Sequence, residues 1–464
     1  MKKRSKLTEK LTELDKRHVW HPFTQMQEWA ASENLIIERG EGNYLIDTDG
    51  NRYLDGVSSL WVTVHGHNNR KINHAIKAQL GKVAHSTLLG LSNVPSIKLA
   101  ARLAKITPGR LNKVFYSDCG STAVEIALKI AFQYHKETEP GSKRNKFLAF
   151  TGAYHGDTFG SMSVGEIGVF SKKFSPLLKK NFYSPYPYCY RCPLSKEHPS
   201  CKLACLGEFE EILKEHSSEI AACVIEPLVQ GAAGIITSPP GFLKGVRALT
   251  KKYGVLLIAD EVATGFGRTG RMFACAHERV SPDIMCLAKG LTGGYLPLAA
   301  TLTTTKIFNA FLGRYDEFKA FFHGHTYTGN PLAAAAALAS LDIFEEQKVI
   351  ERLKPKTTHL TQVLKPLKEL ATVGEVRQRG LMVGIELVAD KKTKKRFPPG
   401  DRTGHRICMS AREKGLIIRP LGDTIVLMPP LSITKRELTR MANILRSEIS
   451  AINIIIPLTP TLSP

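Results

Sequence analysis

The stretch VLLIADEVATGFGRTGRMFACAHERVSPDIMCLAK, from Val255 to Lys289, contains two short apolar runs. The first run ends on Asp260 and Glu261, and the second ends on Lys289. Short runs of aliphatic residues are typical of buried parallel strands. In an open α/β sheet, ligands bind beyond the carboxyl ends of such strands. The stretch therefore predicts two strands that bring an acid and a lysine side by side at a ligand-binding edge.

An acid beside a lysine suits a pyridoxal phosphate (PLP) enzyme. The lysine forms a Schiff base with the cofactor aldehyde, and the acid keeps the pyridine nitrogen protonated so that the ring accepts electrons. Each residue alone also has a structural explanation, because a lysine after a strand is commonly exposed and an aspartate there commonly caps a helix. The glycine-rich segment DEVATGFGRTG (Asp260–Gly270) and the sequence AKG (Ala288–Gly290) favour the catalytic interpretation.

This arrangement resembles the class III aminotransferases of PLP fold type I, over roughly residues 17–450. The resemblance implies an α/β fold with a large domain, built on a mostly parallel sheet, and a smaller α+β domain. We expect an N-terminal segment at 1–75 that joins the small domain, a PLP-binding domain at 76–339 and a C-terminal small domain at 340–455. Residues 456–464 are rich in Pro, Thr and Ser, which predicts a disordered tail.

The composition excludes several classes of function. Lys and Arg number 64 against 42 Asp and Glu, and the resulting charge of +22 raises the hypothesis of a nucleic-acid or membrane-surface protein. The basic residues are spread along the chain, however, and we find no zinc-finger, RNP-type or helix-turn-helix signature. No apolar run approaches the roughly 18 residues that span a bilayer. Because no apolar segment follows the basic start, we expect a cytoplasmic enzyme without a signal peptide.

The family resemblance implies further contacts to the cofactor. A Gly-Ser turn at Gly120 and Ser121 opens a helical pattern, and the free N–H groups at such a helix start suit a phosphate group. By the family's pattern, Tyr154 stacks on the pyridine ring and Glu226 lies beside the ring hydroxyl. Thr326 matches a threonine that binds the phosphate of the neighbouring subunit in this fold type. The resemblance therefore implies a homodimer.

The resemblance also implies a substrate wall. The segment RHVWHPFTQM (Arg17–Met26) is similar to one that lines the substrate pocket in biotin-pathway members of class III, where tyrosine often replaces Phe23. A hydrophobic latch onto the body of the protein is the structural alternative for this segment. Arg419 resembles an arginine that binds the substrate carboxylate, a group that matches the guanidinium fork. The expected substrate contacts are Phe23, Trp61, Tyr154, Lys289, His325 and Arg419.

The resemblance to the biotin-pathway members implies transfer of an amino group to 8-amino-7-oxononanoate, with Lys289 as the general acid and base. These relatives use S-adenosylmethionine or lysine as the amino donor. An aromatic wall favours the sulfonium of S-adenosylmethionine through cation–π contact, but lysine remains open. Two alternatives are an aminotransferase for another ω-amine or ω-amino acid and a PLP-fold protein that binds without turnover. The second has little reason to retain both Asp260 and Lys289.

Four of the nine cysteines, Cys189, Cys192, Cys201 and Cys205, form a C-x2-C-x8-C-x3-C pattern. Such spacing is compatible with a metal ion or an iron–sulfur cluster. The middle gap is shorter than in common zinc patterns. Nine cysteines in a chain of 464 residues do not indicate a disulfide scaffold. A bound metal or cluster, reduced thiols and a disulfide therefore remain three alternatives for these four residues.

Overall fold

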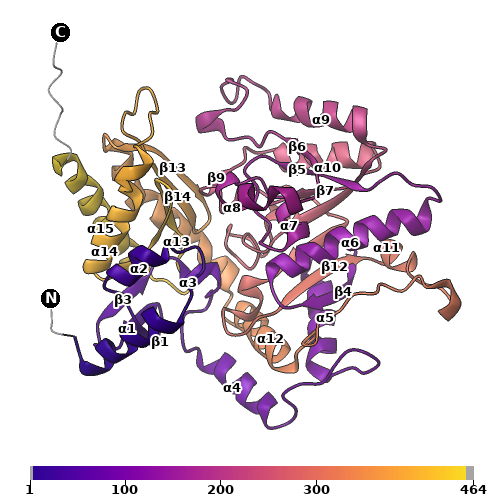
Figure 1. Ribbon diagram of the computed structural model, residues 1–464, viewed down its shortest axis with the longest axis horizontal. Helices are drawn as coiled ribbons and strands as arrows, with labels where there is room; N and C mark the ends of the chain where they lie inside the picture. The colour runs from indigo at the N-terminus through magenta and orange to yellow at the C-terminus, as the bar shows by residue number, and fades with distance from the viewer. Residues whose placement is uncertain (1–3, 456–464) are drawn as a thin grey trace.

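The computed structural model describes residues 4–455 and has a seven-stranded sheet at its centre (Figure 1). The strand order is β4-β12-β11-β10-β7-β5-β6. Strand β12 is antiparallel to both its neighbours, whereas β10 is parallel to β11 and β7. The prediction of a large, mostly parallel sheet is therefore confirmed. The strands are β4 (Leu111–Ser117), β5 (Lys146–Phe150), β6 (Phe182–Ser184), β7 (Ile220–Ile225), β10 (Leu256–Asp260), β11 (Ile284–Leu287) and β12 (Ala299–Thr304).

Helices cover both faces of this sheet, which is why its inner strands β7, β10 and β11 are almost entirely apolar. Side chains alternate between the two faces of a strand. In β10, Ile258 joins the apolar cluster formed with helix α6 (Gly120–Thr138). Its neighbour Leu257 joins the cluster on the other face, with helices α9 (Cys205–His216) and α10 (Phe242–Lys252). A strand between two helical layers buries every residue, so the apolar runs seen in the sequence are explained.

Two smaller sheets lie outside the central one, and the two ends of the chain meet in the first of them. One sheet has the order β1-β2-β3-β15, and β15 pairs in parallel with β3, with Leu416 opposite Leu54. The other sheet has the order β13-β14-β17-β16. The strands are β1 (Ile37–Glu41), β2 (Tyr44–Asp47), β3 (Arg52–Asp55), β13 (Val373–Arg379), β14 (Met382–Leu387), β15 (Leu416–Ile417), β16 (Arg419–Leu421) and β17 (Thr424–Leu427). A separate two-stranded sheet joins β8 (Val229–Gln230) to β9 (Ile236–Thr237).

The remaining helices connect and cover these sheets, and α1 and α15 lie on the same side of the molecule (Figure 1). The α-helices are α1 (Lys6–His18), α2 (Met26–Ala31), α3 (Ser58–Trp61), α4 (Arg70–Leu80), α5 (Val94–Ile106), α7 (Phe159–Ser163), α8 (Gly168–Ser171), α11 (Thr305–Asn309), α12 (Pro331–Glu346), α13 (Val349–Leu364), α14 (Thr403–Glu413) and α15 (Lys435–Ile455). The 3-10 helices are η1 (Lys172–Leu177), η2 (Cys189–Arg191), η3 (Ala274–His277), η4 (Lys289–Thr292), η5 (Tyr315–Glu317), η6 (Lys365–Glu369) and η7 (Pro399–Asp401).

The expected domain boundaries at residues 75 and 339 stay a prediction, and the first of them falls inside α4. The expected disordered tail at 456–464 and the first three residues of the basic start lie outside the described residues. Within residues 4–455, no helix is long and apolar enough to cross a membrane.

Candidate active site

A cavity of about 690 Å³ lies at the carboxyl ends of the central strands. Four adjacent strands each deliver a predicted residue to it: β11 leads to Lys289, β10 ends on Asp260, β7 leads to Glu226, and β5 leads to Tyr154. The strand order therefore places these residues in one row. The predicted residues that line the cavity are Trp61, Gly120, Ser121, Tyr154, Glu226, Asp260 and Lys289.

Lys289 is held in an unusual backbone conformation within this cavity. Its φ of 45° is left-handed, which is strained for a residue with a long side chain. Its Nζ atom lies 5.3 Å from the centroid of the Trp61 ring. Burial lowers the pKa of Lys289, and the negative charges of Asp260 and Glu226 only partly oppose this effect. A buried lysine with a lowered pKa is more readily neutral, as a nucleophile or a general base requires.

Asp260 is paired with His155, which is not among the predicted site residues. The Nδ1 atom of His155 lies 2.7 Å from Oδ2 of Asp260, and the two side chains are 0% and 5% exposed. The other carboxylate oxygen of Asp260 accepts a hydrogen bond from the N–H group of Val262. Burial alone lowers the pKa of His155, but its hydrogen bond to Asp260 and the charge of Asp260 raise it overall. A protonated His155 therefore stabilises Asp260 as an anion.

Glu226 has the electrostatics of a proton donor. Its two carboxyl oxygens accept hydrogen bonds from the N–H groups of Tyr154, at 3.2 Å, and Gly231, at 2.8 Å. Burial raises the pKa of Glu226 to about 7, although the charge of His155 and these two hydrogen bonds oppose the rise. The acid is thus poised to hold or release a proton near neutral pH.

The start of α6 forms an anion site beside these groups. The first N–H groups of the helix, at Gly120 and Ser121, have no acceptor within the helix and lie at its positive end. A side chain at position 120 is excluded, because a Cβ atom there lies 2.5 Å from Cγ1 of Val262. The hydroxyl of Ser121 accepts a hydrogen bond from the N–H group of Thr158 at 3.0 Å, which fixes the neighbouring loop.

These residues fit PLP, on the chemistry of the groups that the cavity contains. An anion site for the phosphate, an acid for the ring nitrogen and a buried amine for the aldehyde all open onto it. Tyr154 adds an aromatic ring, and its hydroxyl donates a hydrogen bond to Asp157 at 2.8 Å. Burial raises the pKa of Tyr154, so the hydroxyl stays protonated.

Phe23 is connected to the cavity through another aromatic residue. It is 58% exposed and does not line the cavity. Its ring centroid lies 5.3 Å from that of Phe170, which in turn lies 5.7 Å from that of Tyr154. Phe170 was not predicted, because nothing in the sequence around it marks a site. The three rings form a continuous row from the N-terminal segment to the cavity.

Three further predicted residues also lie outside the cavity lining. The Nδ1 atom of His325 is hydrogen-bonded to Asp118, which does line the cavity, at 2.6 Å. Arg419 begins β16 and is half-buried, and Thr326 is exposed. Within one chain, the structure therefore brings His325 only to the rim and leaves Thr326 free to face another molecule.

The four clustered cysteines line a second, much smaller cavity of about 20 Å³. All four are free thiols, which gives no support to the disulfide alternative. Among the residues that the structure describes, no group of three or more His, Cys, Asp or Glu side chains is arranged to hold a metal ion. The choice between a bound metal or cluster and reduced thiols stays a prediction.

The comparisons with known proteins agree with this chemistry. The family model for aminotransferase class III matches residues 26–449. The adenosylmethionine-8-amino-7-oxononanoate aminotransferase of Nitratidesulfovibrio vulgaris is 56% identical over 446 residues, which are 96% of this chain and 82% of that protein. The relative of the same name from Geobacter sulfurreducens is 53% identical, over 96% of this chain and 98% of that protein.

Comparison with solved structures also finds aminotransferases. The crystal structure of the adenosylmethionine-8-amino-7-oxononanoate aminotransferase from Methanocaldococcus jannaschii superimposes with a TM-score of 0.91 and 49% identity, over 96% of this chain and 99% of that one. An amine transaminase from an uncultivated Pseudomonas species, in its PLP-bound form, gives a TM-score of 0.89 and 39% identity, over 94% and 98% of the two chains. The chain is therefore a PLP-dependent enzyme that belongs to the class III aminotransferases.

Proposed function

We propose that this protein transfers an amino group from S-adenosylmethionine to 8-amino-7-oxononanoate, giving 7,8-diaminononanoate. The observation that carries the reaction type is the buried Lys289, next to the Asp260–His155 pair in one cavity. The choice of substrates is supported by the relatives at 56% and 53% identity, whose names state this reaction. The proposal keeps the substrate contacts that were predicted from the sequence.

When bound, PLP supplies an aldehyde that reacts with amines and a ring that accepts an electron pair. The Nζ atom of Lys289 would hold the cofactor, and as a free amine it would serve as the general base and acid for the carbon that bears the amino group. Its lowered pKa makes the neutral, proton-accepting form available. Asp260, held anionic by His155, would pair with the ring nitrogen, and Glu226 would share its proton with the ring hydroxyl. The N–H groups of Gly120 and Ser121 would bind the phosphate.

The preference for S-adenosylmethionine is supported by the aromatic wall. Trp61 is an aromatic residue of the cavity lining whose ring already lies 5.3 Å from the ammonium group of Lys289. Its π-face is thus accessible to a cation, and a sulfonium is attracted to it in the same way. Arg419 and His325 are the proposed partners of substrate polar groups, and Phe23 closes the far side of the wall.

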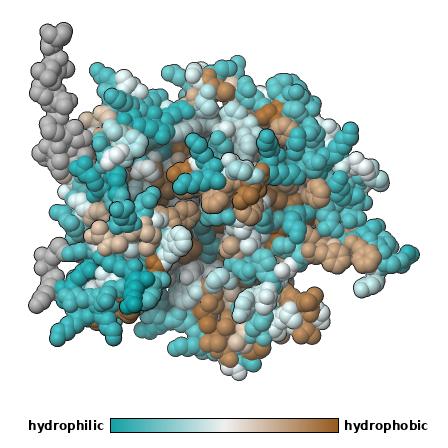
Figure 2. All heavy atoms as spheres, in the orientation of Figure 1, coloured by the Kyte–Doolittle hydropathy of each residue, from teal (hydrophilic) through white to brown (hydrophobic). Residues whose placement is uncertain are grey.

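A homodimer is proposed from an exposed apolar surface formed by two loops. Figure 2 shows apolar side chains gathered at the lower edge of the molecule, where Figure 1 places α4 and the segment that follows it. The side chains of Leu89, Val94 and Phe322 are 89%, 64% and 71% exposed. The two loops are joined because Asn93 donates a hydrogen bond to the carbonyl of Gly329 at 3.0 Å. Large exposed apolar side chains on two linked loops suit a protein interface.

The proposed dimer gives Thr326 its role, because this exposed residue belongs to the second loop. It is then free to reach the phosphate in the neighbouring subunit, as predicted from the family. Sedimentation velocity of the PLP-bound enzyme should give a dimer, and Leu89→Glu combined with Phe322→Glu should give monomers with little activity. A cytoplasmic location also stays a prediction.

The test of the function mixes the PLP-bound enzyme with one amino donor at a time and follows the absorbance of the cofactor. S-adenosylmethionine should convert it to the amine form, and later addition of 8-amino-7-oxononanoate should restore the starting spectrum and yield 7,8-diaminononanoate. Conversion by lysine alone would replace the donor and leave the product unchanged. Conversion without any restoration by 8-amino-7-oxononanoate would refute the proposed acceptor.

A further inference from the structure

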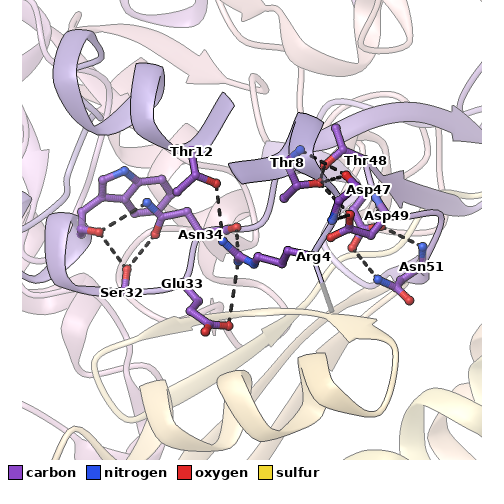
Figure 3. Close-up of polar contacts among 12 residues, drawn as sticks. Arg4, Thr8, Thr12, Ser32, Glu33, Asn34, Asp47, Thr48, Asp49 and Asn51 are labelled. Atoms are coloured by element: carbon purple, nitrogen blue, oxygen red, sulfur yellow. Dashed lines mark hydrogen bonds and ion pairs between the residues drawn. The ribbon is translucent and has the colours of Figure 1, made fainter. Parts of the chain in front are cut away.

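The N-terminal helix α1 is anchored at its start to the turn between β2 and β3 (Figure 3). Asp49 in that turn accepts hydrogen bonds from the N–H group of Ser5, at 2.9 Å, and from the hydroxyl of Thr8, at 2.7 Å. Thr8 also contacts the hydroxyl of Thr48 at 2.7 Å. Arg4 donates to the carbonyl of Asn34 at 2.8 Å, which ties the same end to the chain after α2. The helix is therefore a fixed support.

Near the other end of α1, the carboxylate of Asp15 holds together two residues of the segment that follows the helix. Oδ1 of Asp15 lies 2.9 Å from Nε2 of His21, and its Oδ2 accepts a hydrogen bond from Nε1 of Trp29 at 2.8 Å. The centroids of these two rings lie 4.1 Å apart. Asp15 thus binds both ends of the segment 21–29, and the segment forms a closed loop. The helix at the end of this loop is also fixed by an ion pair, at 2.6 Å, between Glu28 and Arg402.

Phe23 lies inside this closed loop. Its φ of 52° is in the left-handed region, which is unfavourable for a bulky side chain. Such a conformation persists only where the surrounding structure imposes it. The ring of Phe23 packs edge-on against Phe170, and Phe170 packs in the same way against Tyr154 of the cavity. The geometry of one end of the ring row therefore depends on how the loop 21–29 is closed.

We propose that Asp15 is a positioning residue for the substrate wall: by binding His21 and Trp29 together, it holds Phe23 against Phe170 and Tyr154. Phe170 is the middle ring of this wall and sets its shape. The row of three aromatic rings is apolar and suits the alkyl chain of the amino acceptor. This inference rests on the proposed function for the identity of the acceptor. The contacts that carry it do not involve the cofactor.

The first test compares Asp15→Ala with Glu13→Ala, a matched control that removes an exposed acid from the same helix. Asp15→Ala should raise KM for 8-amino-7-oxononanoate at least about fivefold and leave kcat within about twofold, because ground-state packing is lost and the chemical groups are not. Trp29→Phe removes one of the two hydrogen bonds of Asp15 and should raise KM in the same direction by a smaller factor. The double variant should be no worse than Asp15→Ala alone. Equal KM values for Asp15→Ala and Glu13→Ala would overturn the proposal.

The second test needs neither substrate nor turnover. Trypsin cleavage after the exposed Arg17, in the last turn of α1, should be several-fold faster in Asp15→Ala than in Glu13→Ala, because release of the loop 21–29 loosens the end of the helix that precedes it. Equal cleavage rates would overturn the role of Asp15 in closing the loop. If the wild-type enzyme did not turn over 8-amino-7-oxononanoate, the proposed function would fail, while the cleavage test would still decide whether Asp15 closes the loop. Faster cleavage with unchanged KM would show a loose segment that does not shape the wall, which also overturns the proposal.

Discussion

Removal of the His155 imidazole is the most informative perturbation of the cofactor site. His155→Ala leaves Asp260 buried without its partner, at 5% exposure and without the hydrogen bond of 2.7 Å. A hydrogen bond to a charged group contributes about 1.5–3 kcal/mol. If that energy supports the anionic Asp260 during the reaction, the rate of amino transfer should fall by about 10- to 150-fold. The fold should persist, because His155 lies at the cavity and its Nε2 atom has no partner among the described residues.

The assay is a single-turnover reaction with excess donor, in which the rate is read from the cofactor absorbance. His155→Asn is the matched variant, because its amide can donate a hydrogen bond but carries no charge. It should lie between His155→Ala and the wild type. A rate for His155→Ala within about twofold of the wild type, at saturating PLP, would refute the role of the pair, since general acid–base and charge effects of this kind are larger.

The same pair predicts a pH dependence with a definite sign. The pKa of His155 is raised in the folded protein, so its support of Asp260 is complete below the ordinary histidine pKa of about 6.5. This support is lost as the pH rises through the raised value. The single-turnover rate of the wild type should therefore decline on the alkaline side, and His155→Asn should lack that decline.

Three further variants test neighbouring groups. Asp260→Asn should retain PLP but lower turnover at least about 100-fold, because the ring nitrogen loses its anionic partner, and steady-state kinetics will measure this. Burial raises the pKa of Glu226 to about 7 from 4.5, so the stability of the wild type falls as the pH rises through this interval. Glu226→Gln should therefore flatten the pH dependence of thermal unfolding. An unchanged slope would contradict that pKa. Gly120→Ala should weaken PLP binding about tenfold, because the added Cβ atom would clash with the side chain of Val262. The double variant with Val262→Ala should regain the affinity, and equilibrium dialysis against PLP measures both.

The sequence predicted the fold, and it predicted which residues line the cavity where a strand delivers the residue directly. Asp260 and Lys289 follow apolar runs that become β10 and β11, and Glu226 follows another that becomes β7. The sequence analysis took Asp260, and not the adjacent Glu261, as the acid of the site. Successive residues point in opposite directions, and the structure shows Glu261 accepting hydrogen bonds from the N–H groups of Ala274 and Cys275, away from the cavity lining.

Other features depend on contacts between distant segments and could not be predicted. His155 reaches Asp260 because β7 alone separates their strands β5 and β10, and strand order is not contained in local pattern. Phe170 becomes important only because Phe23, from the distant N-terminal segment, packs against it. The spacing of the four clustered cysteines left three alternatives open, because spacing alone does not fix the directions of the side chains.

The central claim is that Lys289 holds the cofactor. Reduction of the PLP-bound enzyme with borohydride, followed by proteolysis and mass spectrometry, tests it directly. The cofactor should be fixed to the peptide that contains Lys289, and Lys289→Ala should bind PLP without fixing it and should lose turnover. Cofactor fixed to any other lysine, or turnover of Lys289→Ala within about tenfold of the wild type, would contradict the account, since a general acid–base group of this kind contributes more.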